Sequence, residues 1–404
     1  MLLSGADLRI VVVSFTRLPF AHVIVLWTLC AALAFVQVAP AQERVGEIAV
    51  AVRDPVGRPL PGAEVVASSG DWQAATTDAT GPVLLRVTPG TYEVVVAHAE
   101  LAVLPTAGTV TVRSGESRTV EFRALPRSVG VTGKVRFRSE PPTALSGLHA
   151  AAYSGDPADG TYPVSVAPLA EDESFSLTVP PGRWRIGLLE IPQGIAVREV
   201  VTGQGRESRV ELEVDFRTLT GVTGLLYEAG LVTERLGPAF SLTTVGLYAI
   251  GTDGQHRVLA TAQARSDQRY ALLAQAPVGA PLAAFAWRPG GLPVPAAVRS
   301  HAGSGSVSFV DFRFVPTSGV LVGTVVDTAG RRLPEAWVTA VSAVRYEDWM
   351  MWGRPVHALD GTFRLRVPQG PVLVRAWRDS RRLGAPQRVS IGDTGPTTVR
   401  LEAP

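Results

Sequence analysis

Residues 45–54 read VGEIAVAVRD, and this stretch decides the fold. Ile48, Val50 and Val52 alternate with other residues, so a β-strand places all three side chains on one face. Residues 90–99, GTYEVVVAHA, alternate in the same way. Such runs, bounded by Gly, Pro, Asp and Ser, indicate half-buried antiparallel strands. The sequence therefore predicts an all-β fold made of small Ig-like β-sandwiches.

One sequence pattern occurs four times along the chain. Alternating apolar residues run up to a proline and a glycine in GPVLLRVTPGTY (81–92), SFSLTVPPGRW (174–184), RYALLAQAPVGAP (269–281) and GTFRLRVPQGPVL (361–373). Units of this spacing are too long for solenoid repeats and suit a string of independent sandwiches. We therefore predict four tandem β-sandwich domains, at residues 42–125, 126–217, 218–316 and 317–404.

The first unit resembles the carboxypeptidase regulatory-like domain in residues 54–65 (DPVGRPLPGAEV), 77–81 (TDATG) and 89–92 (PGTY). The fourth unit is similar at 327–330 (DTAG) and 333–338 (LPEAWV), whereas the middle units keep only the later half of the pattern. The resemblance implies a transthyretin-like β-sandwich, close in fold to starch-binding modules. It implies no catalytic residues.

The shared motifs are turn signals. In Asp-x-x-Gly the Asp side chain caps backbone amides and the glycine supplies a positive φ. The pair Pro89-Gly90 predicts a second tight turn with Gly90 at positive φ. In the fourth unit Glu335 stands where the pattern has glycine, so we expect a turn of another type there.

The N-terminus carries a long apolar run. Residues 18–41 follow Arg9 and Arg17 and end in Ala-Pro-Ala, which predicts a secretory signal helix cleaved before Gln42. The run is also long enough to span a bilayer, so an uncleaved N-terminal anchor is the alternative. Any membrane contact is expected only through this segment.

Composition excludes several classes of protein. The formal net charge is +2, from 38 Lys+Arg and 36 Asp+Glu, so no basic field predicts nucleic-acid binding. The 40 Gly and 31 Pro interrupt the chain throughout and argue against a mostly helical or polytopic membrane protein. A single Cys excludes a disulfide framework and a cysteine zinc site.

The sequence contains no recognisable catalytic or metal-binding motif. The histidines beyond the N-terminal run are spaced unlike metal ligands: His98, His149, His256, His301 and His357. The HExxH, GxSxG and phosphate-loop patterns are missing. We therefore expect no catalytic residue, no cofactor and no metal, and a protein that is not an enzyme.

Residues 344–353, VRYEDWMMWG, interrupt the strand pattern of the fourth unit. Exposed aromatic and methionine side chains are costly without a partner, so Tyr346, Trp349, Met350 and Trp352 are candidate contacts for sugar rings, a peptide or a neighbouring subunit. In the alternative interpretation the loop folds back and fills a sandwich end or the junction of the third and fourth units.

These observations favour a secreted, non-enzymatic, multidomain protein that serves as a structural or adhesive spacer at the bacterial cell surface or in the periplasm. A carbohydrate-binding protein that uses the fourth-unit aromatics is the second hypothesis. An accessory subunit of an envelope assembly is the third. The expected partners are accordingly a polysaccharide or an envelope protein.

Overall fold

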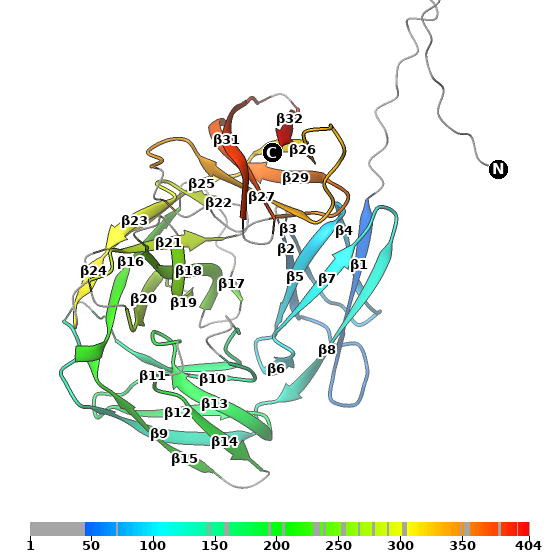
Figure 1. Ribbon diagram of the computed structural model, residues 1–404. Helices are drawn as coiled ribbons and strands as arrows, with labels where there is room; N and C mark the ends of the chain where they lie inside the picture. The colour runs from blue at the N-terminus through cyan, green and yellow to red at the C-terminus, as the bar shows by residue number, and fades with distance from the viewer. Residues whose placement is uncertain are drawn as a thin grey trace, which may run out of the picture. The chain divides into compact units, whose positions relative to one another are not determined.

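The structure is a computed structural model of the chain (Figure 1). It describes residues 45–69, 72–143, 145, 147–156, 161–192, 195–203, 207–228, 235–236, 240–251, 256–265, 267–276, 279–288, 291–300, 305–347, 350, 356–378, 381–393 and 395–403. The predicted signal segment lies outside these residues. In the described part the only helical element is the short 3-10 helix η2, Phe216–Thr218, so the predicted all-β class is confirmed.

The first sandwich packs sheet β4-β1-β8-β6 on sheet β3-β2-β5-β7. Its strands are β1 (Gly46–Arg53), β2 (Glu64–Ser68), β3 (Trp72–Thr76), β4 (Val83–Val87), β5 (Gly90–Ala97), β6 (Leu101–Leu104), β7 (Ala107–Val112) and β8 (Ser117–Pro126). Ala49 and Ala51 are buried as well, so β1 is covered on both faces rather than half-buried as predicted. Ile48, Val50 and Val52 lie on one face, as the alternation in residues 45–54 predicts. They share one core with Tyr92 and Val94 of the opposite sheet.

The second sandwich packs sheet β12-β9-β15 on sheet β11-β10-β13-β14. Its strands are β9 (Val129–Phe137), β10 (His149–Tyr153), β11 (Ser165–Pro168), β12 (Ser174–Val179), β13 (Gly182–Leu188), β14 (Arg198–Thr202) and β15 (Ser208–Val214). Its core includes Phe175, Trp184 and Phe216, and extends to Leu273 of the next sandwich.

The third sandwich has sheets β20-β16-β25-β22, with β24 also on β16, and β17-β18-β21-β23, with β19 also on β18. Its strands are β16 (Thr220–Glu228), β17 (Arg235–Leu236), β18 (Phe240–Ile250), β19 (His256–Arg265), β20 (Arg269–Ala274), β21 (Leu282–Trp287), β22 (Gly291–Pro293), β23 (Ala297–Ser300), β24 (Val307–Phe309) and β25 (Phe312–Pro316). Phe312 and Phe314 lie in its core.

The fourth sandwich packs sheet β29-β26-β32 on sheet β28-β27-β30-β31. Its strands are β26 (Gly319–Val326), β27 (Ala336–Ser342), β28 (Val356–Ala358), β29 (Thr362–Val367), β30 (Gly370–Arg378), β31 (Arg381–Ile391) and β32 (Thr397–Glu402). Leu321, Val374 and Leu401 are core residues drawn from both sheets.

One pairing departs from the antiparallel expectation. The opening strand of each sandwich pairs in parallel with a closing strand: β1 with β8, β9 with β15, β16 with β24 and β25, and β26 with β32. Parallel partners need a long connection, which the intervening strands of each sandwich supply. The alternation of apolar and polar residues within a strand does not indicate which distant strand it pairs with.

The Asp-x-x-Gly turns form as predicted. Asp54 Oδ1 accepts the backbone N–H groups of Val56 and Arg58 at 3.0 and 2.8 Å, and Gly57 has a φ of 89°. Asp327 Oδ1 accepts two backbone N–H groups in the same way, each at 2.9 Å.

Two turn expectations were wrong. Gly90 does not adopt a positive φ, so its backbone is available to any residue. Glu335 does not change the turn type: its φ of 64° lies in the same left-handed region as that of Gly62, at 78° in the first sandwich. A non-glycine residue therefore carries the strain of that turn.

Candidate functional site

Of the aromatic loop, residues 344–353, the structure describes residues 344–347 and 350. Met350 is only 3% exposed and packs with Tyr248, Ala283 and Val341, while Tyr346 is half-buried against the same cluster. Tyr248 and Ala283 belong to the third sandwich and Val341 to the fourth, so Met350 fills the junction between the two.

This placement of Met350 agrees with the interpretation in which the loop folds back on the protein. Trp349 and Trp352 lie outside the described residues. A ligand-contact role for Tyr346, Trp349, Met350 and Trp352 therefore stays a prediction.

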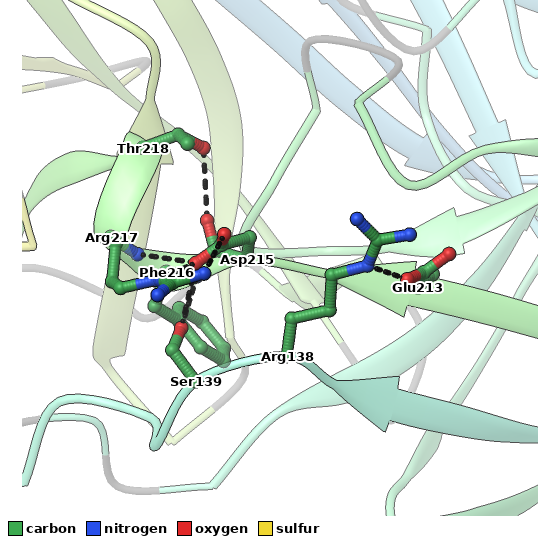
Figure 2. Close-up of polar contacts among 7 residues, drawn as sticks. All are labelled: Arg138, Ser139, Glu213, Asp215, Phe216, Arg217 and Thr218. Atoms are coloured by element: carbon green, nitrogen blue, oxygen red, sulfur yellow. Dashed lines mark hydrogen bonds and ion pairs between the residues drawn. The ribbon is translucent and has the colours of Figure 1, made fainter.

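The segment that leads from the second sandwich to the third is held to the second by polar contacts (Figure 2). Asp215 follows β15, and its Oδ1 accepts from Ser139 Oγ at 3.0 Å and from Arg217 Nε at 3.0 Å. Its Oδ2 accepts from Arg217 Nη2 at 2.8 Å. The Thr218 hydroxyl donates to the Asp215 carbonyl at 2.9 Å. Beside this group, Arg138 forms an ion pair with Glu213.

The same contacts direct Phe216 inward. Asp215 is the N-cap of η2, and the Phe216 amide donates to Ser139 Oγ at 2.8 Å. The Phe216 ring lies 5.4 Å from that of Phe137, centroid to centroid, and is buried in the core. The segment that connects these sandwiches is thus fixed both by the hydrogen bonds of Asp215 and Ser139 and by the burial of the Phe216 ring.

The predicted boundary at residue 217 falls on this anchored turn. An N-cap Asp ahead of a short helical turn is a signal that the sequence does contain, in residues 215–218 (DFRT). The prediction from the sequence places only a domain boundary there and does not include the cap.

Hydrogen bonds from the Arg217 side chain hold the pKa of Asp215 well below its usual range. A folded-state pKa below the unfolded one gives stability that is present above the unfolded value, near 4, and is lost as pH falls through the folded value. We expect Asp215→Asn to lower the urea midpoint of the second sandwich at neutral pH, and the gap from wild type to close as pH falls below about 4.

The urea midpoints at neutral and acid pH measure this effect. Ser139→Ala is the control, because it removes the two hydrogen bonds of the Ser139 hydroxyl, with Asp215 and with the Phe216 amide, but leaves the Arg217 pair in place. A gap that stays constant with pH would contradict the role assigned to the Asp215 carboxylate.

A residue with a buried carboxylate, Glu190, also lies where the second sandwich contacts the third. Glu190 is 2% exposed, and its Oε1 lies 2.9 Å from His149 Nδ1, while its Oε2 accepts the His149 backbone N–H at 3.0 Å. The Glu190 carbonyl accepts from the Leu273 amide of the third sandwich at 2.7 Å. Burial, with the charge of Glu190 beside it, raises the pKa of Tyr153. The pair links β10 to the turn after β13 and to β20, and has the geometry of a structural contact.

The described residues hold no group of three or more His, Cys, Asp or Glu side chains placed to bind a metal. Within the same residues no helix has the length and apolar character needed to cross a bilayer.

The chain is similar to known proteins in two ways: one domain matches a protein family, and the chain has distant matches among solved structures. Residues 47–125 match the family model of the Carboxypeptidase regulatory-like domain. No curated protein sequence matches the chain.

Solved structures give distant likenesses. The Bacillus anthracis TIE protein is 10% identical over 85% of this chain and 66% of its own, slightly under two thirds, with a TM-score of 0.18. The major pilin subunit BcpA of Bacillus cereus is 11% identical over 89% of this chain and 99% of its own, at 0.19. A streptococcal ancillary pilin is 12% identical over 68% and 98%, at 0.21. At these scores the likenesses carry no argument about function. The family match and the two packed sheets together identify residues 47–125 as a carboxypeptidase regulatory-like domain, a transthyretin-like β-sandwich.

Proposed function

We propose that the protein is a non-enzymatic structural spacer, exported to the bacterial cell surface or the periplasm. One observation carries the proposal: large side chains are buried at each junction between successive sandwiches. Tyr162 packs on Val66 and Val95 of the first sandwich, Phe216 lies in the core cluster that Leu273 of the third sandwich joins, and Met350 fills the third junction. Side chains buried in this way join the sandwiches into one body, as a spacer requires.

We also propose that the sandwiches correspond to domains at 42–125, 126–217, 218–316 and 317–404. In the described residues the strand ladders stay within these ranges, except that Pro126 at the end of β8 still pairs with Leu101 of the first sandwich, and the cores extend across the ends of the ranges.

The fourth of these domains is proposed as a second carboxypeptidase regulatory-like domain. Gly46 of β1 faces Val87 of β4, and Gly319 of β26 faces Val367 of β29, at the same point of the two ladders. The Asp turn that follows β1 has the same hydrogen bonds as the turn that follows β26. Two domains that share register and turn chemistry support a duplication of one module.

Export is tested by N-terminal sequencing of the protein from its native host. We expect the mature chain to begin at Gln42, because a positive flank, an apolar run and Ala-Pro-Ala precede that residue. A chain that begins at Met1 in the membrane fraction would favour the anchor instead.

The proposed location at the cell surface or in the periplasm has its own test. A tag placed after Ala403 should be accessible to antibody or protease on intact cells, or after opening of the outer envelope. Protein retained in the cytoplasm with residues 1–41 intact would contradict the proposal, and specific retention on an envelope polysaccharide would favour the carbohydrate-binding hypothesis.

A further inference from the structure

His357 is an unusual residue for an edge strand. It lies in the middle of β28 yet is only 9% exposed, and its ring stacks on Trp337 of β27, with centroids 4.6 Å apart and planes at 26°. Its Nε2 lies 2.9 Å from Glu335 Oε2. An ionised carboxylate only accepts hydrogen bonds, so this contact places a hydrogen on Nε2.

The other ring nitrogen faces the first sandwich. His357 Nδ1 lies 3.2 Å from Thr91 Oγ1 of β5, a residue 266 positions away in the sequence. In the neutral ring with hydrogen on Nε2, Nδ1 is an acceptor, and the Thr91 hydroxyl is its donor. Thr91 Oγ1 also lies 2.9 Å from Thr111 Oγ1 of β7, so the contact continues across the sheet of the first sandwich.

The backbone of Glu335 supports the same assignment. Glu335 takes a φ of 64° at the position where the first sandwich has Gly62. A non-glycine residue in this conformation costs free energy and persists where its surroundings fix it, often at a site of function. The carboxylate that this residue adds is the one that contacts His357.

We infer that His357 forms an intramolecular contact, here called the clasp, between the fourth sandwich and the first: the face of β28 and β27 binds the face of β5 and β7 in the same chain. Glu335 is the positioning residue that fixes the orientation of the imidazole. The inference goes beyond the spacer role, since a clasped chain has one fixed length until this contact breaks. The contact can fail while export and surface location hold, and the reverse.

Proximity is tested in the full chain with Cys30→Ser as background. We expect a short bifunctional thiol cross-linker to join Thr91→Cys and His357→Cys within one chain, as located by peptide mass mapping. The control pair Thr178→Cys and His357→Cys, with Thr178 exposed on β12 of the second sandwich, should not react above background. Products that join two chains, or a yield no higher than that of the control, would overturn the intramolecular clasp.

The role of the side chains is tested by a double-substitution cycle with amide hydrogen exchange. Thr91→Val should lower the protection of β28 amides by roughly tenfold, the loss of the hydrogen bond to His357. His357→Ala also loses the contacts with Glu335 and Trp337 and should lower protection at least as much, and the double variant should lose little more than His357→Ala alone. Glu335→Gly relieves the backbone but removes the carboxylate, and should lower protection in the same way. Thr178→Val should change nothing. Additive losses from Thr91→Val and His357→Ala would show that the two side chains do not interact, and would overturn the assignment.

Discussion

We expect Gly133→Ala to destabilise the second sandwich by about 2 kcal/mol, and Gly130→Ala on the same strand to leave its stability unchanged or slightly higher. Both glycines lie in β9 with ordinary backbone angles. The substitution is the same chemically, so the difference reports only what each new methyl group meets.

At Gly133 the methyl group has no space. It would lie 2.3 Å from Cζ of Phe175, the residue opposite on β12, and 2.5 Å from the carbonyl oxygen of Val210 on β15. The backbone oxygen cannot rotate away, so the strands themselves have to shift. At Gly130 the nearest atom is Cγ of Glu207 at 3.7 Å, an ordinary contact on a flexible side chain.

Hydrogen exchange of peptides from β9, β12 and β15, followed in increasing urea, measures the local free energy of unfolding in the full chain. Equal stability of the two variants would show that β9 and its neighbours adjust freely, and would contradict the close packing of Phe175 over Gly133.

The same arrangement recurs in other sandwiches. A methyl group on Gly323 would lie 2.6 Å from Cζ of Phe363, and one on Gly246 would lie 2.1 Å from Cζ of Phe285. Each aromatic residue sits directly opposite its glycine on the neighbouring strand. An aromatic ring laid across a strand glycine covers the backbone that the missing side chain leaves open.

Local pattern was enough to predict the fold class and much of the turn chemistry. Alternation over residues 45–54 matches the face of β1 that lies in the sandwich core, and Asp54 and Asp327 cap their turns as predicted. These features depend on residues within a few positions of one another. The parallel pairing of β1 with β8 depends on strands about 70 residues apart, and the sequence contains no local signal for it.

The candidate sites were less predictable, because tertiary contacts decide them. Met350 could be an exposed contact or a packing residue until the third sandwich is placed against it. His357 is a lone histidine in the sequence, and its partners come from the turn before β27 (Glu335) and from the first sandwich (Thr91). Glu335 itself was visible as an exception to the glycine pattern, but its left-handed backbone was not.

Phe216→Ala is expected to have the largest effect of any single substitution considered, a loss of roughly 3–5 kcal/mol from the second sandwich. Phe216 is 2% exposed and belongs to the core that also contains Leu212 and Trp184. Its removal leaves a cavity at the point where Asp215 and Ser139 fix the backbone, so the surrounding chain cannot close the gap without breaking those hydrogen bonds.

Phe309→Ala is the matched control, because Phe309 is 67% exposed on β24 and its loss should change stability by no more than about 0.5 kcal/mol. Exchange of the β9 and β15 amides in urea reads the second sandwich, and exchange of the β16 and β20 amides reads the third. Because Leu273 of β20 shares the Phe216 core, we expect both sets to lose protection together. If only β9 and β15 were affected, the second junction would not couple the two sandwiches, and the strongest support for a rigid spacer would be lost.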